Sequence, residues 1–175
     1  MRIRSCLFWL AWALLACGCA QTVPEGETPR PTVTGPTAPG FSLLSPLGDP
    51  VALEPGSQPG EPTLIAFWSP SWDPDHAAEE IVLRQLLERY GNRKLRVIAV
   101  AYDEKPEQIR NYLRQSPVPY EVAMGDEGIY DAYRLEAIPT MVLVAPDGGE
   151  AGRWEGHQRI ESLAEKVEPL LSGGN

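Results

Sequence analysis

Nearly continuous apolar runs recur between residues 63 and 145 and predict strands that are buried on both faces. The runs are Thr63–Trp68, Arg96–Tyr102 and Met141–Ala145. A strand that is covered on both sides of a sheet lacks the alternation of apolar and polar positions that marks a half-exposed strand. Phe41–Leu44 and Pro50–Leu53 flank the turn residues Leu47-Gly48-Asp49 and predict a short hairpin, and Gly152–Trp154 is predicted to be an edge strand.

Apolar residues at helical spacing fill the segments between these strands. Asp73 and Pro74 predict the start of the first helix, because Asp caps free amide groups and Pro suits the first helical position. Gly91 predicts its end. Its expected buried face consists of Ile81, Val82, Leu86, Leu87 and Tyr90, and further helices are expected over Pro106–Gln115, Gly128–Tyr133 and Ile160–Leu171. Strands that alternate with helices and end in a hairpin predict one α/β domain over residues 38–172, with a central mixed sheet flanked by helices.

The first 16 residues have the pattern of an export signal. Arg2 and Arg4 precede an apolar run that is too short to span a bilayer comfortably. The segment Leu14-Leu15-Ala16-Cys17 then resembles the lipobox of bacterial lipoproteins, in which the cysteine becomes the lipidated first residue. Simple secretion after cleavage at Ala20 is the alternative. The resemblance implies attachment to a membrane through a lipid anchor, and Gly18 in place of an aspartate implies the outer membrane, facing the periplasm.

Residues 17–37 are expected to form a linker that begins with the lipidated cysteine. Prolines alternate there with Thr, Gly and Glu, so the segment has too few apolar groups to offset the entropy of ordering. Prolines favour extended polyproline II conformations. The linker would therefore hold the domain away from the membrane.

Composition and charge narrow the possible partners. The chain of 175 residues carries 15 basic and 24 acidic residues, a formal net charge of −9. Such a balance disfavours nucleic acid and anionic lipid headgroups. The three cysteines, Cys6, Cys17 and Cys19, all precede the predicted domain and cannot staple it.

The segment from Ala66 to Asp75 resembles the active-site turn of the TlpA/ResA-type thioredoxin-like proteins. That family reads Phe-Trp-Ala-x-Trp-Cys-x-Pro-Cys there. This chain keeps Phe67, Trp68 and Pro74, but Trp72 and Asp75 stand at the two cysteine positions, with Asp73 and Pro74 between them. Neither replacement can form a thiolate or a disulfide, so thiol-disulfide exchange at this motif is excluded.

Three further stretches resemble the same family. Ala38–Leu43 is similar to its opening Ala-Pro-x-Phe-x-Leu, and Asp147-Gly148 to the turn of its closing hairpin. Ala137-Ile138-Pro139-Thr140 is similar to its Gly-x-Pro-Thr loop, whose proline is cis and faces the cysteine motif. The resemblance implies a thioredoxin-like fold for the α/β domain.

Trp72, Ile138 and Pro139 are the candidate partner-binding residues. An exposed tryptophan at a former active site could anchor a partner, or it could fold back and cover the groove. In the family, the backbone beside the cis proline pairs with an extended segment of the substrate protein. Pro139 could equally serve only to shape a tight loop.

A polar cluster at the start of the first predicted helix raises the question of a metal. His76 and Glu80 lie four residues apart on one helix face, and histidine and carboxylates are ligands for Zn or Cu. The neighbouring acids Asp73, Asp75 and Glu79 could instead stabilise the helix N-terminus through its dipole. His157 is expected in a loop after the edge strand. No cofactor and no catalytic residue is predicted.

Three functions are compatible with these patterns. The favoured prediction is a redox-inactive thioredoxin-like domain of a cell-envelope lipoprotein, which binds an extended segment of an envelope protein at the former active-site groove. The first alternative follows the family's general role: a thiol-disulfide oxidoreductase-family protein in cell redox homeostasis, using Cys19 or assisting a redox-active partner. The second alternative is a metal carrier.

Overall fold

The fold is described from a computed structural model, which covers residues 35–56 and 61–172. The predicted signal, Cys17, Cys19 and nearly all of the predicted linker lie outside the described residues. None of the helices in the described part is long and apolar enough to cross a membrane.

The chain forms a seven-stranded mixed sheet in the order β2-β1-β5-β4-β3-β6-β7. The central strands are β3 (Thr63–Trp68), β4 (Arg96–Ala101) and β6 (Thr140–Val144). β3 runs parallel to β4 and antiparallel to β6. Shorter strands complete the two sides: β1 (Phe41–Leu44), β2 (Pro50–Leu53), β5 (Glu121–Met124) and β7 (Glu150–Glu155).

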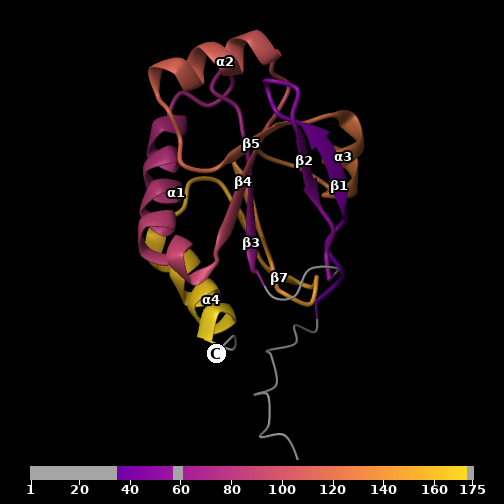
Figure 1. The fold of residues 1–175 in the computed structure, drawn as a ribbon, viewed down its shortest axis with the longest axis vertical. Helices are drawn as coiled ribbons and strands as arrows, with labels where there is room; N and C mark the ends of the chain where they lie inside the picture. Colours follow the sequence, from indigo (N-terminus) through magenta and orange to yellow (C-terminus); the bar gives the residue numbers. More distant parts are fainter. Residues whose placement is uncertain (1–34, 57–60, 173–175) are drawn as a thin grey trace, which may run out of the picture.

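Helices cover both faces of the sheet (Figure 1). α1 (His76–Tyr90) and α4 (Ile160–Ser172) lie on one face, α3 (Glu127–Ala132) lies on the other, and α2 (Pro106–Gln115) crosses one end. A short 3-10 helix, Gly91–Arg93, follows α1. The predicted α/β class, with a mixed sheet flanked by helices, is therefore confirmed.

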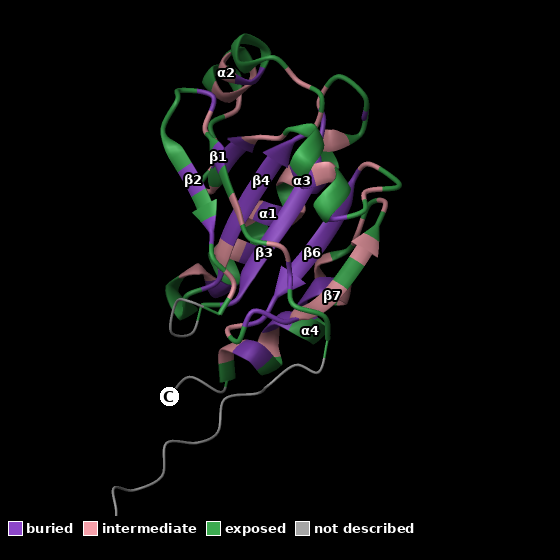
Figure 2. Ribbon diagram, turned by 90° about the vertical axis from the view of Figure 1, so that its right-hand side faces the viewer, coloured by how far each residue is buried: buried purple, intermediate pink, exposed green. Residues whose placement is uncertain are grey.

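The central strands supply the core because both of their faces are covered (Figure 2). Leu64 and Ala66 of β3 pack toward α1 and α4, whereas Ile65 and Phe67 pack toward α3. All four are fully buried. Each large side chain of this kind contributes roughly 1.5–3 kcal/mol relative to an exposed position. A rigid sheet therefore supports the loop that leaves β3 at Trp68.

Several predicted elements differ from the structure. α1 begins at His76 and not at Asp73, because the Asp73 carboxylate accepts a hydrogen bond from the Asp75 amide at 2.9 Å and closes a local turn. Ile81, predicted to be buried, is 55% exposed, and Leu83 is buried in its place. β5 was not predicted, because its four residues mix one charge with three apolar side chains.

Candidate functional site

A turn between β3 and α1 carries Trp72 and Asp75, the residues that the resemblance places at the two cysteine positions. Glu104, from the loop after β4, holds this turn in place. Its carboxylate accepts hydrogen bonds from the Ser69 hydroxyl at 2.7 Å and from the Ser71 amide and hydroxyl, both at 2.9 Å. The buried Ser69 hydroxyl in turn accepts from the Trp72 amide. The backbone around Trp72 is thus positioned by hydrogen bonds from a separate loop.

Trp72 is exposed and lies at the edge of an aromatic group. Its side chain is 65% exposed, one of the most exposed large apolar side chains in the described part. The ring meets Tyr102 edge-on, with centroids 6.2 Å apart, and Tyr102 packs on Tyr130 at 4.4 Å. Trp72 therefore does not fold back into the core. It presents a large apolar surface on an ordered turn.

The loop before β6 contains a cis peptide bond between Ile138 and Pro139, as the resemblance implied. Pro139 itself is buried, and its carbonyl accepts a hydrogen bond from the Gly156 amide at 2.8 Å. Thr140 donates its hydroxyl to the Ala137 carbonyl at 2.7 Å. Among the described residues, the backbone N–H and carbonyl of Ile138 have no hydrogen-bond partner. Ile138, rather than Pro139, thus presents free backbone groups.

Asp73, Glu79 and His157 come together from three segments of the chain. Asp73 lies in the turn after β3, Glu79 in the first turn of α1, and His157 directly after β7. One nitrogen or oxygen atom of each lies within 4.8 Å of the other two. The Asp73 Oδ1 atom is 3.4 Å from the His157 Nε2 atom. Since Gly156 holds the Pro139 carbonyl, this cluster connects the motif turn to the cis-proline loop.

Glu79 is a buried acid without a hydrogen-bond partner. Its side chain is 4% exposed, and neither carboxylate oxygen has a partner in the described part. Burial, together with the nearby Asp73 carboxylate, raises the pKa of Glu79 to about 8. Asp73 is 7% exposed, and its Oδ2 atom is also without a partner.

His76 and Glu80, the metal candidates suggested by their spacing, have separate partners. The His76 Nδ1 atom donates to the Asp73 carbonyl at 2.7 Å. Glu80 accepts hydrogen bonds from Arg84, Tyr112 and Ser116. Burial disfavours ionisation of Glu80, but these hydrogen bonds outweigh it and lower its pKa. Glu80 therefore ties α1 to the end of α2, and its oxygens are occupied.

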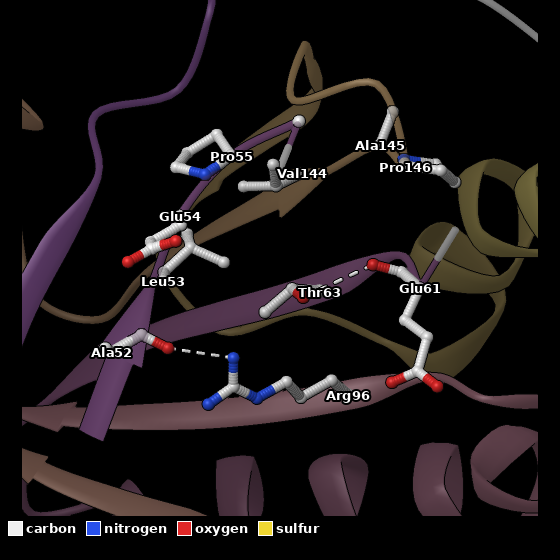
Figure 3. Close-up of a pocket in the computed structure, with 11 residues that line it drawn as sticks. Ala52, Leu53, Glu54, Pro55, Glu61, Thr63, Arg96, Val144, Ala145 and Pro146 are labelled. Atoms are coloured by element: carbon white, nitrogen blue, oxygen red, sulfur yellow. Dashed lines mark hydrogen bonds between the residues drawn. The ribbon is translucent and has the colours of Figure 1, made fainter. Parts of the chain in front are cut away.

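A hollow of about 390 Å³ lies at the opposite end of β3 (Figure 3). Thr63, Arg96 and Val144 are among the residues that line it. Arg96 points across it to the Ala52 carbonyl at 2.9 Å, and its guanidinium also binds both oxygens of Glu121. The Arg96 guanidinium is thus already bound by groups of the protein and is not free to bind a ligand in this hollow. We therefore place the candidate site at the other end of β3, where the motif turn lies.

Comparison with known proteins agrees with this architecture. A family model described as thioredoxin-like matches residues 60–150. The chain belongs to the thioredoxin-like family. Within the matched part of this thioredoxin-like protein, there is no cysteine.

Curated relatives of the thioredoxin-like chain are bacterial thiol-disulfide oxidoreductases. It is 24% identical over 174 residues to the thiol-disulfide oxidoreductase ResA of Bacillus thuringiensis subsp. konkukian (strain 97-27), covering 97% of this chain and 99% of that protein. It is 25% identical over 137 residues to ResA of Bacillus cereus (strain ATCC 10987 / NRS 248), covering 78% of each.

Solved structures share the fold of the thioredoxin-like domain at low identity. A thiol:disulfide interchange protein of the thioredoxin family from Chlorobium tepidum TLS superposes with a TM-score of 0.69 at 20% identity, covering 81% of this chain and 99% of that one. A secreted disulfide oxidoreductase of Mycobacterium tuberculosis gives 0.61 at 19% identity, covering 73% and 94%. At these identities the likeness shows the fold alone.

Two functional features of the thioredoxin-like domain were missed by reasoning from the sequence. Glu104 lies more than 30 residues from the serines that it binds, so only the parallel pairing of β3 with β4 brings them together. His157 was predicted to lie in a loop after the edge strand, but its contact with Asp73, at 3.4 Å, was not predicted. The sequence did contain a signal for His157: it is a polar residue just after β7, at the end of the sheet where the motif turn also lies.

Proposed function

We propose that this chain is a redox-inactive thioredoxin-like domain that holds an extended segment of a partner protein beside the former active-site turn. The observation that carries the proposal is the absence of any cysteine from residues 60–150, although the family's turn and proline loop are retained. Thiol-disulfide exchange begins with attack by a thiolate, and neither Trp72 nor Asp75 can supply one. Recognition through backbone pairing needs no sulfur.

Two exposed features of the site support partner binding. Ile138 has a free backbone N–H and a free carbonyl, the two groups with which an added strand pairs. Trp72 offers apolar area on a turn that is already ordered by Glu104, so little side-chain and backbone entropy is lost on binding. An exposed tryptophan on such a turn has the character of an interaction hot spot.

An insulin-reduction assay tests the redox part of the proposal. We expect the full chain, with its cysteines intact, to show no turnover above the uncatalysed rate with dithiothreitol, because residues 60–150 contain no cysteine. Catalysis by the full chain that is lost in Cys19→Ser would contradict the proposed inactivity.

Affinity purification from cells tests the binding part. We expect Trp72→Ala to reduce recovery of a specific partner by roughly thirtyfold or more, since truncation of a hot-spot residue costs about 2 kcal/mol or more. Ile81→Ala is the matched control, because Ile81 is also exposed but lies on α1. Equal recovery with both variants would contradict a binding site at Trp72.

A role beside a redox-active partner is the second function that an observation favours. The curated relatives named above are thiol-disulfide oxidoreductases. A domain that keeps their fold without their sulfurs could present a substrate to a catalytic member of the family. The partner recovered with Trp72 would then contain a reactive cysteine pair, which thiol labelling of the co-purified protein would detect.

Export and lipid attachment are part of the same proposal. The lipobox-like segment ending at Cys17 supports a lipid anchor, and Gly18 supports the outer membrane, facing the periplasm, as the location. Metabolic labelling with a palmitate analogue should label the wild-type chain and leave Cys17→Ser unlabelled. Labelling of Cys17→Ser would contradict the assignment of the anchor.

A further inference from the structure

Two buried carboxylates and one half-exposed imidazole converge where β3, α1 and β7 meet. The Asp73, Glu79 and His157 ligand atoms lie within 4.8 Å of one another, and the shortest pair, Asp73 Oδ1 and His157 Nε2, is 3.4 Å apart. The residues come from positions far apart in the sequence. Their convergence is therefore a product of the fold and not of one acidic stretch.

Three of the four carboxylate oxygens in this cluster have no hydrogen-bond partner in the described part; the fourth, Asp73 Oδ1, accepts from the Asp75 amide at 2.9 Å. Glu79 is only 4% exposed, and neither of its carboxylate oxygens has a hydrogen-bond partner in the described part. Asp73 Oδ2 is equally without one. Within the described ranges, no Lys or Arg forms an ion pair with either acid. A buried carboxylate is disfavoured as an ion unless it is paired or coordinates a metal, and these unpartnered oxygens lie close enough together to share one cation.

We propose that Asp73, Glu79 and His157 bind one divalent transition-metal ion of the Zn²⁺ type. One imidazole nitrogen and two carboxylate oxygens are three protein ligands, and zinc sites with three protein ligands leave a fourth position for water or another molecule. Ca²⁺ and Mg²⁺ prefer oxygen ligands alone, so the His157 nitrogen favours an ion of the Zn²⁺ type over them, and Cu(I) prefers thiolates and thioethers.

The spacing of the ligand atoms suits such an ion after a small movement. Ligands at ~2.1 Å from a tetrahedral zinc lie about 3.4 Å from one another. The Asp73–His157 distance of 3.4 Å already matches this value. Glu79 has to approach by a change of rotamer, and its oxygens are free to move because nothing holds them. His157, whose side chain is 40% exposed, gives the ion a path from solvent.

The proposed ion site is independent of partner binding at Trp72 and Ile138. It lies on the buried side of the motif turn, whereas Trp72 and the neighbouring Asp75 are exposed. Through Gly156 it is linked to the Pro139 carbonyl. A bound ion would join the motif turn, α1 and the segment after β7, and this would raise stability by mass action.

Zinc titration of the full chain, with Cys6, Cys17 and Cys19 replaced by serine so that no thiolate competes, tests the site. Competition with a chromophoric chelator should show one Zn²⁺ per chain. Glu79→Gln and His157→Ala should each weaken binding by roughly tenfold or more, because even loss of groups that support a metal ligand costs 10–100-fold. At a Zn²⁺ concentration near the dissociation constant of the parent chain, added Zn²⁺ should raise the melting temperature of the parent more than that of either variant.

Asp75→Asn and His76→Ala are the matched controls. Each removes a neighbouring acid or the other histidine of the chain without removing a proposed ligand. Zinc affinity within about twofold of the parent in both controls is the expected result. Absence of saturable binding would overturn the proposal, as would equal binding in Glu79→Gln and His157→Ala or equal loss in all four variants. Partner recovery through Trp72 is measured separately, so failure of one proposal leaves the other standing.

Discussion

At the scale of single residues, the most informative feature is Glu79, because the amino-acid sequence around it does not indicate that its side chain is buried. The sequence suggested that Glu79 stabilises the start of a helix through the helix dipole. The structure instead buries Glu79 beside Asp73 with both oxygens unpartnered. Neighbouring positions differ sharply: Glu80, one residue later, has three hydrogen-bonding partners. Rotation by about 100° per residue around a helix is enough to separate these two environments.

Stability without metal should depend on pH through Glu79. Its pKa rises from 4.5 to about 8 on folding. Between these values the folded state keeps a proton that the unfolded state releases, so the unfolded state binds fewer protons. The free energy of unfolding therefore falls as pH rises through this window, by about 1.4 kcal/mol per pH unit for this group.

Glu79→Gln removes that dependence. In the presence of EDTA we expect the variant to be more stable than the parent by on the order of 2–3 kcal/mol at about pH 7, and nearly equal to it at about pH 4.5. Urea unfolding followed by tryptophan fluorescence measures this difference. The exposed Glu88→Gln serves as the control and should show no pH-dependent change. A constant difference between Glu79→Gln and the parent at both pH values would contradict the buried, unpartnered state of Glu79.

At the scale of elements, the motif turn between β3 and α1 is held in place by Glu104, a residue of a different loop. Three hydrogen bonds to the Glu104 carboxylate hold residues 69–71, and the turn ends where α1 begins at His76. The sequence predicted most strands and helices within a few residues, because the apolar runs reflect burial directly. It misplaced the start of α1, since Asp73-Pro74 has the composition of a helix start while the Asp73 carboxylate is used in a preceding turn.

Glu104→Ala should loosen this turn. Removal of a charged acceptor that serves three donors is expected to lower the free energy of unfolding by about 2–3 kcal/mol. It should also weaken partner recovery through Trp72, because the backbone next to Trp72 loses its support. Glu107→Ala, which removes an exposed acid paired with Arg110, is the control and should leave stability nearly unchanged, because a solvent-exposed ion pair contributes little. Equal stability of the two variants in urea unfolding would contradict this role of Glu104.

At the scale of the whole molecule, the chain has the thioredoxin-like fold, and residues 60–150 contain no cysteine. The sheet order, the cis Ile138–Pro139 peptide and the helices on both faces are those of a thioredoxin-like domain. The sequence allowed the fold to be predicted because the framing motifs of the family are spread along the chain. It did not disclose the meeting of Asp73, Glu79 and His157, because contacts between distant segments depend on strand order and on loop paths that local patterns do not encode.

Photo-crosslinking in cells from position 72 tests whether the former active-site turn binds a partner protein. A photoreactive amino acid is placed at 72 and, as a control, at the exposed position 88 on α1. We expect a discrete crosslinked protein from position 72 that is absent from position 88, with the attachment mapped by mass spectrometry to an extended segment of that protein. Crosslinking that is equal at both positions, or absent at 72, would contradict the claim that the former active-site turn is a recognition site.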